Sequence, residues 1–264
     1  MRKALIWIVV AGCGSPGQTS DLSEADLSMA STDMASSMDI ASATDLASAD
    51  MATIRHDLSF IDGPPGAITY STNFNLTESP VSEGGAWHHN GLDWTTAKTS
   101  GGLAYGTQTG SGGFDDSYAY LSGFPPDQSA SAVIHLESGV SAAYAEVEIL
   151  LRWTDSAHFS RGYECNLAFN SSYAQIIRWP GAFGTQLSDF AFLSAAMPIP
   201  ALKDGDILQC DIVGNVITER LNGQVIATAT DSVITSGNPG MGFYWQSGAA
   251  TSKYGFTSYS ATSL

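Results

Sequence analysis

The feature that most constrains the fold is a succession of short runs rich in β-branched and aromatic residues, which starts just after Gly66. Gly, Asn, Asp, Ser and Pro separate these runs, and no long stretch has the three-and-four apolar spacing of a helix. The runs cover residues 67–74, 103–107, 118–123, 131–137, 144–153, 162–169, 174–179, 206–213, 216–222, 224–231, 240–246 and 254–261. Strand-length runs at this spacing predict an all-β sandwich or barrel, and about 200 residues suffice for such a domain to bury a core.

Alternation inside the runs assigns side chains to an apolar, inner phase and a polar, outer phase. In 144–153 the predicted inner residues are Val147, Ile149, Leu151 and Trp153, and the predicted outer residues are Tyr144, Glu146, Glu148 and Arg152, with Leu150 as an exception. Cys165 and Cys210 both fall on inner phases of their runs. In an exported protein such a pair predicts a disulfide if the two strands lie side by side, and two buried free thiols are the alternative.

The N-terminus has the layout of a bacterial export signal. Two cations precede an apolar run over 4–11 that is too short to span a bilayer. Residues 10–13, Val-Ala-Gly-Cys, resemble the bacterial lipobox, which implies that residues 1–12 are a lipoprotein signal peptide and that Cys13 is lipidated. By the same resemblance Gly14, in place of an aspartate, implies the outer membrane or the cell surface. An ordinary cleaved signal peptide is the alternative interpretation.

Residues 13–65 differ in composition from the rest of the chain. Triplets of Asp, then Leu, Ile or Met, then Ala or Ser recur there at irregular spacing, and no aromatic residue occurs between 14 and 59. Repeated aspartates repel each other, and a segment with so few large apolar side chains cannot form a core. We therefore predict a disordered tether over 13–65 and one folded domain over 66–264.

The charge of the chain limits its partners. It has 26 Asp and Glu residues against 10 Lys and Arg residues, a formal net charge of -16. No basic patch or Lys/Arg run occurs, which argues against nucleic acid and anionic polymers. A neutral polymer, or one that carries its own cations, is compatible with this charge.

The order of several short motifs resembles the concanavalin A-like, laminin G-like jelly roll of lectins, glucanases and bacterial surface proteins. The motifs are NFN at 73–75 followed by Trp87, AEVEILLR at 145–152, GYECNL at 162–167, LKDGDILQCDIVGN at 202–215, ITERLNGQVI at 217–226, GNPGMGFYW at 237–245 and YGFTSYSA at 254–261. Within them, Asn222-Gly223 predicts a two-residue hairpin turn. The resemblance implies a two-sheet antiparallel jelly-roll sandwich, an architecture that hosts both binding proteins and enzymes.

Glu146 and Glu148 are the first candidate catalytic residues. Residues i and i+2 of a strand lie about 6.5 to 7 Å apart, so the carboxyl groups can reach the separation of about 5 to 5.5 Å that retaining glycosidases use. The signature of the resembling glucanases runs Glu, apolar, Asp, apolar, Glu on one strand, whereas Leu150 stands in place of the third acid. A solvated strand face is the alternative interpretation of the two glutamates.

His135 supports a second catalytic hypothesis. It lies on the polar phase of its run, and if that strand pairs with 144–153 it shares a face with Glu146 and Glu148. This arrangement resembles jelly-roll polysaccharide lyases, which use a histidine with a tyrosine and an arginine to remove a proton beside a uronate carboxylate. The other motifs of those lyases are not evident.

Calcium is the one cofactor for which the chain offers a candidate. Asp115 and Asp116, in a glycine-rich stretch, can supply oxygen ligands to Ca²⁺, and solvated loop acids are the alternative. His88 and His89 are adjacent, so an extended chain turns them to opposite faces, and no third ligand follows at a zinc-site spacing.

Sugar rings stack on exposed Trp and Tyr side chains, and their hydroxyl groups pair with polar side chains, so outer-phase residues of these kinds form the candidate ligand-binding set. The set is Tyr144, Glu146, Glu148, Arg152, Asn166, Arg178, Tyr244 and Gln246. We predict a lipid-anchored surface protein whose jelly roll binds a carbohydrate or another surface ligand without catalysis. The alternatives are a glycoside hydrolase or polysaccharide lyase that uses His135, Glu146 and Glu148, and a structural adhesion module.

Overall fold

The computed structural model describes residues 66–109, 116–140, 145–169, 172–182, 191–245 and 251–264. The regular elements within these residues are β-strands, and no described helix is long and apolar enough to cross a membrane. The predicted signal peptide, the lipidated Cys13 and the predicted tether lie outside the described residues. The prediction of an all-β domain is confirmed.

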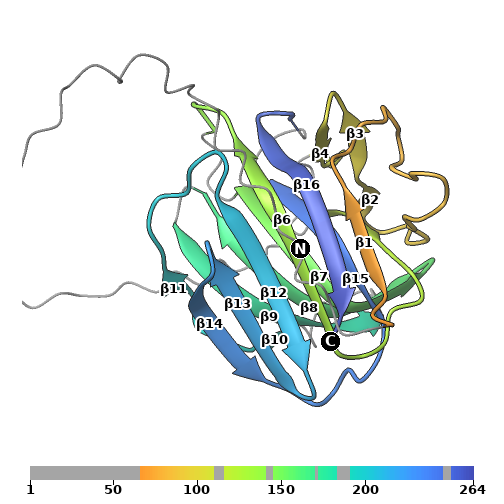
Figure 1. Cartoon of the computed structure of the whole chain (residues 1–264), viewed down its shortest axis with the longest axis vertical. Helices are drawn as coiled ribbons and strands as arrows, with labels where there is room; N and C mark the ends of the chain where they lie inside the picture. Colours follow the sequence, from red (N-terminus) through yellow and green to blue (C-terminus); the bar gives the residue numbers. More distant parts are fainter. Residues whose placement is uncertain (1–65, 110–115, 141–144, 170–171, 183–190, 246–250) are drawn as a thin grey trace, which may run out of the picture. The chain divides into compact units, whose positions relative to one another are not determined.

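The strands form two eight-stranded sheets, which face each other in Figure 1. The first sheet contains β1 (Thr69–Thr72), β3 (Lys98–Ser100), β4 (Leu103–Tyr105), β6 (Gln128–Leu136), β12 (Ile207–Val213), β13 (Val216–Leu221), β14 (Gln224–Thr230) and β16 (Tyr254–Ser263). The second contains β2 (Thr95–Thr96), β5 (Asp116–Tyr120), β7 (Ala145–Ser156), β8 (Phe159–Ala168), β9 (Tyr173–Ala182), β10 (Ala191–Phe192), β11 (Met197–Pro198) and β15 (Asn238–Trp245).

The order of the strands gives the sandwich a jelly-roll connectivity. The first sheet runs β14-β13-β12-β6-β16-β4-β3 with β1 beside β16, and the second runs β10-β9-β8-β7-β15-β5-β2 with β11 beside β9. The chain passes repeatedly between the sheets: β6 lies between β12 and β16, whereas the next strand, β7, lies between β8 and β15. These central pairs are antiparallel, and the short β2 runs parallel to β5. The predicted two-sheet jelly roll is confirmed.

The inner faces of the two sheets enclose the main hydrophobic core. Val147, Ile149 and Leu151 of β7 are fully buried in it, together with residues of the first sheet such as Ile134 and Leu208. Burial alternates along β6 and β12, as expected for strands with one face in the core and one toward water.

A disulfide crosses this core. It joins Cys165 on β8 to Cys210 on β12, with the Cα atoms 6.3 Å apart. Because β8 belongs to the second sheet and β12 to the first, the bond links the two layers of the sandwich and not two neighbouring strands. Both side chains point into the core from opposite sheets, and they meet there.

A β-bulge at Arg152 reverses the predicted orientation of Trp153. The pairing of β7 with β8 shifts between Leu151 and Thr154, so that Arg152 and Trp153 together face the single residue Gly162. Arg152 adopts a φ of 49°, and a Cβ on Gly162 would lie 2.4 Å from a ring carbon of Trp153. Trp153 therefore packs on the side of the second sheet that faces away from the main core, and its prediction as an inner residue is wrong.

Glu219 is an ionisable residue inside the main core. It lies on β13, where it pairs with Cys210 and Ala227 on the two flanking strands, and it is fully buried. Neither carboxyl oxygen has a hydrogen-bond partner among the described residues. Burial, and to a lesser extent the charge of Glu164, raises the pKa of Glu219 well above its ordinary value.

Removing the disulfide is expected to destabilise the domain. A double Cys165→Ser, Cys210→Ser variant loses the link between the sheets and should lower the free energy of unfolding by about 2 to 4 kcal/mol, because the closed loop restricts the unfolded chain. Urea denaturation of the full chain measures this loss, and the wild type under reducing conditions should show the same loss. Equal stabilities of the oxidised wild type and the double variant would contradict a disulfide in the native protein.

Glu219 is expected to make stability fall with rising pH. The folded state keeps the carboxyl protonated while the unfolded state ionises at the ordinary glutamate pKa, so above that pKa the folded state binds more protons and loses about 1.4 kcal/mol per pH unit. Glu219→Gln removes this loss and should melt at a higher temperature than the wild type at pH 8, with the two converging near pH 4. The exposed Glu137→Gln serves as the control, and a difference that is constant with pH would refute the assignment.

Candidate functional site

The candidate site lies on the outer face of the second sheet, the side turned away from the first sheet. Strands β9, β8, β7, β15 and β5 are adjacent there, and residues that pair across them share a face. One row across the sheet is Tyr173, Ala168, Glu146, Tyr244 and Asp116. The next is Gln175, Asn166, Glu148, Gly242 and Tyr118, and the third is Ile177, Glu164, Leu150, Gly240 and Tyr120. The face therefore changes along its strands from carboxyl groups to aromatic and aliphatic side chains.

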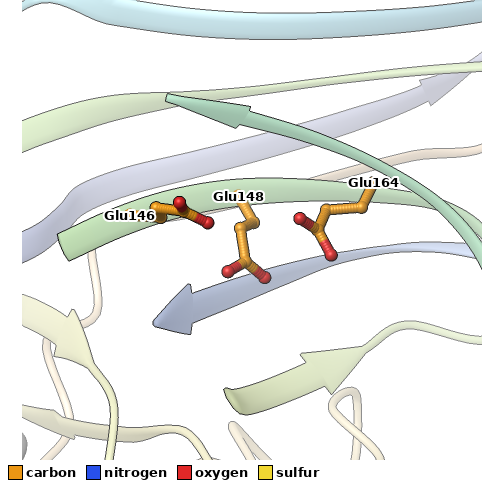
Figure 2. Close-up of side chains that lie close together, drawn as sticks. All are labelled: Glu146, Glu148 and Glu164. Carbon is orange, nitrogen blue, oxygen red and sulfur yellow. The ribbon is translucent and has the colours of Figure 1, made fainter. Parts of the chain in front are cut away.

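Glu146, Glu148 and Glu164 bring their carboxyl groups together on this face, as Figure 2 shows. One carboxyl oxygen from each lies within 4.8 Å of the others. The three residues are 7%, 2% and 3% exposed. The interpretation of Glu146 and Glu148 as a solvated strand face is wrong, because the outer face of this sheet is itself buried. We call the three residues the glutamate cluster.

Neighbouring side chains donate hydrogen bonds to two members of the glutamate cluster. Asn166 Nδ2 donates to Glu164 Oε1 at 2.9 Å and to Glu146 Oε2 at 3.3 Å. The Tyr173 hydroxyl also donates to Glu146, and the indole nitrogen of Trp179 donates to Glu164. These bonds hold the two carboxyl groups in place from strands β8 and β9.

Glu148 fits beside Glu146 because its neighbour on β15 is a glycine. A Cβ on Gly242 would lie 2.1 Å from Glu148 Oε2, so any larger residue displaces the carboxyl group. No hydrogen bond reaches Glu148 from the described residues, and the charges that act on it are those of Glu164, Asp116 and Glu146. Glu148 is thus the member of the cluster to which no side chain in the described part of the chain donates a hydrogen bond.

Burial raises the pKa of all three carboxyl groups. It raises the pKa of Glu146 to about 7, with the Tyr173 hydrogen bond opposing the shift and the charge of Glu164 adding to it. It raises the pKa of Glu164 to about 7 as well, in spite of that residue's two hydrogen bonds. Burial and then the neighbouring carboxylates raise the pKa of Glu148 well above its ordinary value. At neutral pH the three carboxyl groups are therefore not all ionised.

An apolar cluster occupies the other end of the outer face. Its members are Trp94, Tyr118, Tyr120, Leu150, Trp153, Ile177 and Trp179. The rings of Trp94 and Trp153 stack with centroids 6.0 Å apart, and Trp179 meets Trp94 edge-on at 4.6 Å. Leu150, the exception to the predicted alternation, lies here because this face is buried too.

Asp155 fixes the segment that covers the apolar cluster. Its carboxylate accepts hydrogen bonds from the backbone nitrogens of Asn90 and Gly91, at 2.6 and 3.1 Å. It also accepts bonds from the hydroxyl groups of Tyr118 and Tyr120, both at 2.7 Å. Residues 90–94 thereby cover the outer face of β7 at Leu150 and Trp153.

Tyr173 and Tyr244 form the less buried rim of the same face. Both are half-buried, and they lie in one cross-strand row on either side of Glu146, with the small Ala168 between Tyr173 and Glu146. Tyr173 is three strands away from Tyr244, a backbone separation of about 14 Å at the usual strand spacing.

Arg152, a predicted ligand-binding residue, has a structural role instead. Its guanidinium group donates to the carbonyl oxygens of Pro126, Ile234 and Gly214 at 2.7 to 2.8 Å and lies 3.3 Å from Asp127. It is 3% exposed. The prediction is wrong because the bulge turns this side chain toward loop carbonyls and away from the glutamates.

Arg178 also lies away from the glutamate cluster. It pairs with Tyr163 on β8, whose ring is in the main core, and its guanidinium group forms an ion pair with Asp231. Its predicted place in the ligand-binding set is therefore wrong: Arg178 occupies the inner phase of β9.

His135 does not share a face with the glutamates. Its strand, β6, pairs with β12 and β16 in the first sheet, so the expected pairing with β7 is absent from the described strands. His135 Nδ1 lies 2.9 Å from Asp204 Oδ1. The hypothesis of a catalytic site that combines His135 with Glu146 and Glu148 is wrong on this geometry.

Of the other predicted residues, Tyr144, Gln246 and Asp115 lie outside the described residues. Asp116 is 5% exposed and lies on β5 in the row of Glu146, so the alternative of a solvated loop acid does not hold for it, whereas calcium binding by Asp116 stays a prediction. Asn166 and Tyr244 do join the outer face.

Glu164, Tyr173 and Trp179 are site residues that sequence reasoning missed. Glu164 shares the outer phase with Asn166, two residues further on, and this alternation was the signal that could have found it. Nothing local in the sequence shows that Tyr173 and Trp179 contact the glutamates, because both depend on the pairing of β9 with β8.

Comparisons with known proteins found similar structures but no similar sequences. The chain matches no protein-family profile and no curated protein sequence. It is similar in structure to carbohydrate binding module CBM66 from Bacillus subtilis, with a TM-score of 0.43 and 17% identity over 65% of this chain and 92% of that one.

Two enzymes are similar to a comparable degree. A kappa-carrageenase from Zobellia galactanivorans has a TM-score of 0.45 and 12% identity over 76% of this chain and 97% of that one. An endo-beta-1,3-glucanase from Pyrococcus furiosus has a TM-score of 0.47 and 11% identity over 74% of this chain and 93% of that one. Similarity at this level concerns the jelly-roll fold alone.

Proposed function

We propose that this protein is anchored to the bacterial cell envelope by a lipid on Cys13 and binds a carbohydrate chain at the rim of the outer face without cleaving it. The observation that carries the proposal is the cross-strand row in which Tyr173 and Tyr244 lie on either side of Glu146. Aromatic rings stack on the apolar faces of sugars, and carboxyl and phenol groups pair with sugar hydroxyls. The small Ala168 lets the Tyr173 side chain reach Glu146 in this row.

The separation of the two tyrosines favours an oligosaccharide over a single sugar. About 14 Å between their backbones is wider than one pyranose ring, so a ligand that touches both is a short chain. The net charge of -16 favours a neutral polymer, because an anionic one is repelled at every step of its approach.

The burial of the glutamate cluster argues against catalysis. Two catalytic carboxyl groups of a glycosidase flank the bond that they cleave, and the three glutamates contact each other within 4.8 Å while they are at most 7% exposed. A glycosidic bond cannot reach carboxyl groups that are buried to this extent. Hydrolysis is nevertheless the second candidate function, because the pKa of about 7 for Glu146 and Glu164 suits a general acid.

Replacement of a rim tyrosine is expected to weaken glycan binding. Tyr244→Ala removes one stacking surface and should lower affinity about tenfold, or about 1.4 kcal/mol, for any polysaccharide that the wild type retains. Affinity electrophoresis against neutral and acidic polysaccharides measures this. Tyr105→Ala, on β4 of the first sheet, is the matched control and should bind as the wild type does.

The same panel separates the candidate functions. Retention without new reducing ends supports binding, whereas new ends that Glu146→Gln abolishes would replace the proposal by hydrolysis. No retention of any polysaccharide would leave the adhesion module as the better description. Equal loss in Tyr244→Ala and Tyr105→Ala would contradict the assignment of the rim.

The lipid anchor predicts a separate outcome. Cys13→Ser removes the thiol that would carry the acyl chains, and several such chains are needed for firm anchoring. The variant should move from the membrane fraction to the soluble fraction of the producing bacterium. A variant that remains in the membrane fraction would contradict the lipoprotein assignment, and wild-type protein labelled with a radioactive fatty acid provides the positive control.

A further inference from the structure

The glutamate cluster is an arrangement of like charges that no described cation neutralises. None of the ion pairs among the described residues includes Glu146, Glu148 or Glu164. The described arginine ion pairs are those of Arg152 with Asp127, Arg178 with Asp231 and Arg220 with Asp211. A fourth carboxyl group, that of Asp116, also acts on Glu148. Such a group of carboxylates has to hold protons or a cation.

Asn166 supplies an independent sign of a missing partner. It is 1% exposed, and its Oδ1 is buried without a hydrogen-bond partner among the described residues. The Nδ2 atom of the same amide lies 2.9 Å from Glu164 and 3.3 Å from Glu146, so the amide is directed into the cluster. Rotation of the amide by half a turn exchanges the two atoms and presents an oxygen to the carboxyl groups of Glu146 and Glu164, which Nδ2 now contacts.

We propose that Glu146, Glu148, Glu164 and the side-chain oxygen of Asn166 form a binding site for one Ca²⁺ ion. All four donors are oxygens, which calcium prefers and which zinc does not. Carboxylates that bind in a bidentate manner, together with water, complete the six to eight oxygens that calcium usually takes. This inference goes beyond the proposed function, because it requires no saccharide.

The spacing of the carboxyl oxygens is compatible with calcium. Oxygen ligands lie about 2.3 to 2.6 Å from Ca²⁺, so two ligands on opposite sides of the ion are about 4.6 to 5.2 Å apart. For Mg²⁺, at about 2.0 to 2.1 Å, that limit is about 4.2 Å. One carboxyl oxygen from each residue lies within 4.8 Å of the others, which is inside the limit for calcium.

Two features of the cluster prepare it for an ion. Glu148 has no hydrogen-bond donor among the described residues, so a cation gains a ligand there without breaking a bond. Gly242 keeps the space next to Glu148 Oε2 open, because a Cβ at that position would lie 2.1 Å away. The hydrogen bonds of Tyr173 and Trp179 orient the other two carboxylates from outside.

Calorimetric titration of the EDTA-treated full chain with calcium chloride tests the site. The wild type should bind one ion and melt at a higher temperature in calcium than in EDTA. Glu148→Gln should bind calcium at least about tenfold more weakly and lose the melting shift. Asp204→Asn, which removes an exposed carboxylate in the turn before β12, beside His135, is the matched control and should titrate as the wild type does.

Terbium luminescence provides a second readout of the same position. Trp179 donates to Glu164, so a terbium ion in the cluster lies close enough to be sensitised by tryptophan excitation, and calcium should displace it. If Glu148→Gln does not fold, Glu164→Gln replaces it, and melting in EDTA checks both variants.

Three results would overturn the proposal. One is the absence of calcium binding and of sensitised terbium emission by the wild type up to about 10 mM, beyond the weakest usual class of calcium sites. Another is unchanged binding by a folded Glu148→Gln or Glu164→Gln variant, which would place the ion elsewhere. The third is a loss of calcium affinity in Asp204→Asn as large as the loss in Glu148→Gln. Because no polysaccharide is present, these results are independent of whether the rim binds a glycan.

Discussion

Burial of the second sheet on both of its faces is the constraint on which the candidate site depends. The inner face packs against the first sheet, and the apolar cluster around Trp94 and Trp153 covers part of the outer face. Polar side chains that lie beside this cluster lose contact with water and have to find partners among themselves. Glu146, Glu148 and Glu164 therefore interact strongly, whereas on a solvated strand they would be three independent carboxylates.

The bulge at Arg152 provides much of this environment. One extra residue in β7 moves Trp153 to the outer face, where it stacks on Trp94. The same irregularity directs the guanidinium group of Arg152 into loop carbonyls. Uninterrupted alternation would have kept a cation on the face of Glu148. A single local change in strand geometry thus builds the apolar end of the face and removes Arg152, the cation that alternation would have placed there, from the acidic end.

The limits of prediction follow from the range of each interaction. The strands, the Asn222-Gly223 turn with positive φ at both residues, and the all-β sandwich were predictable because alternation and turn chemistry are local. The inner phase of both cysteines was predictable for the same reason, but their crossing between sheets was not. The burial of Glu146 and Glu148 was not predictable, because it depends on contacts from the neighbouring strands β8, β9 and β15. The bulge could not be predicted from the sequence either. Arg152 and Trp153 continue the alternating polar and apolar pattern, and only their backbone conformation departs from it.

Glu146 connects the two parts of the outer face. It belongs to the glutamate cluster through its contacts with Asn166 and the neighbouring carboxyl groups, and it belongs to the rim through the hydrogen bond from Tyr173. A proton or a cation that changes the charge on Glu146 therefore changes the acceptor that Tyr173 faces, and a ligand that engages the Tyr173 hydroxyl removes a donor from Glu146. Such linkage is reciprocal by thermodynamic necessity, so the occupancy of the cluster and the affinity of the rim depend on each other wherever both are populated. The acidic end of the face is in this sense part of the surface that a ligand meets, although the ligand need not touch Glu148 or Glu164.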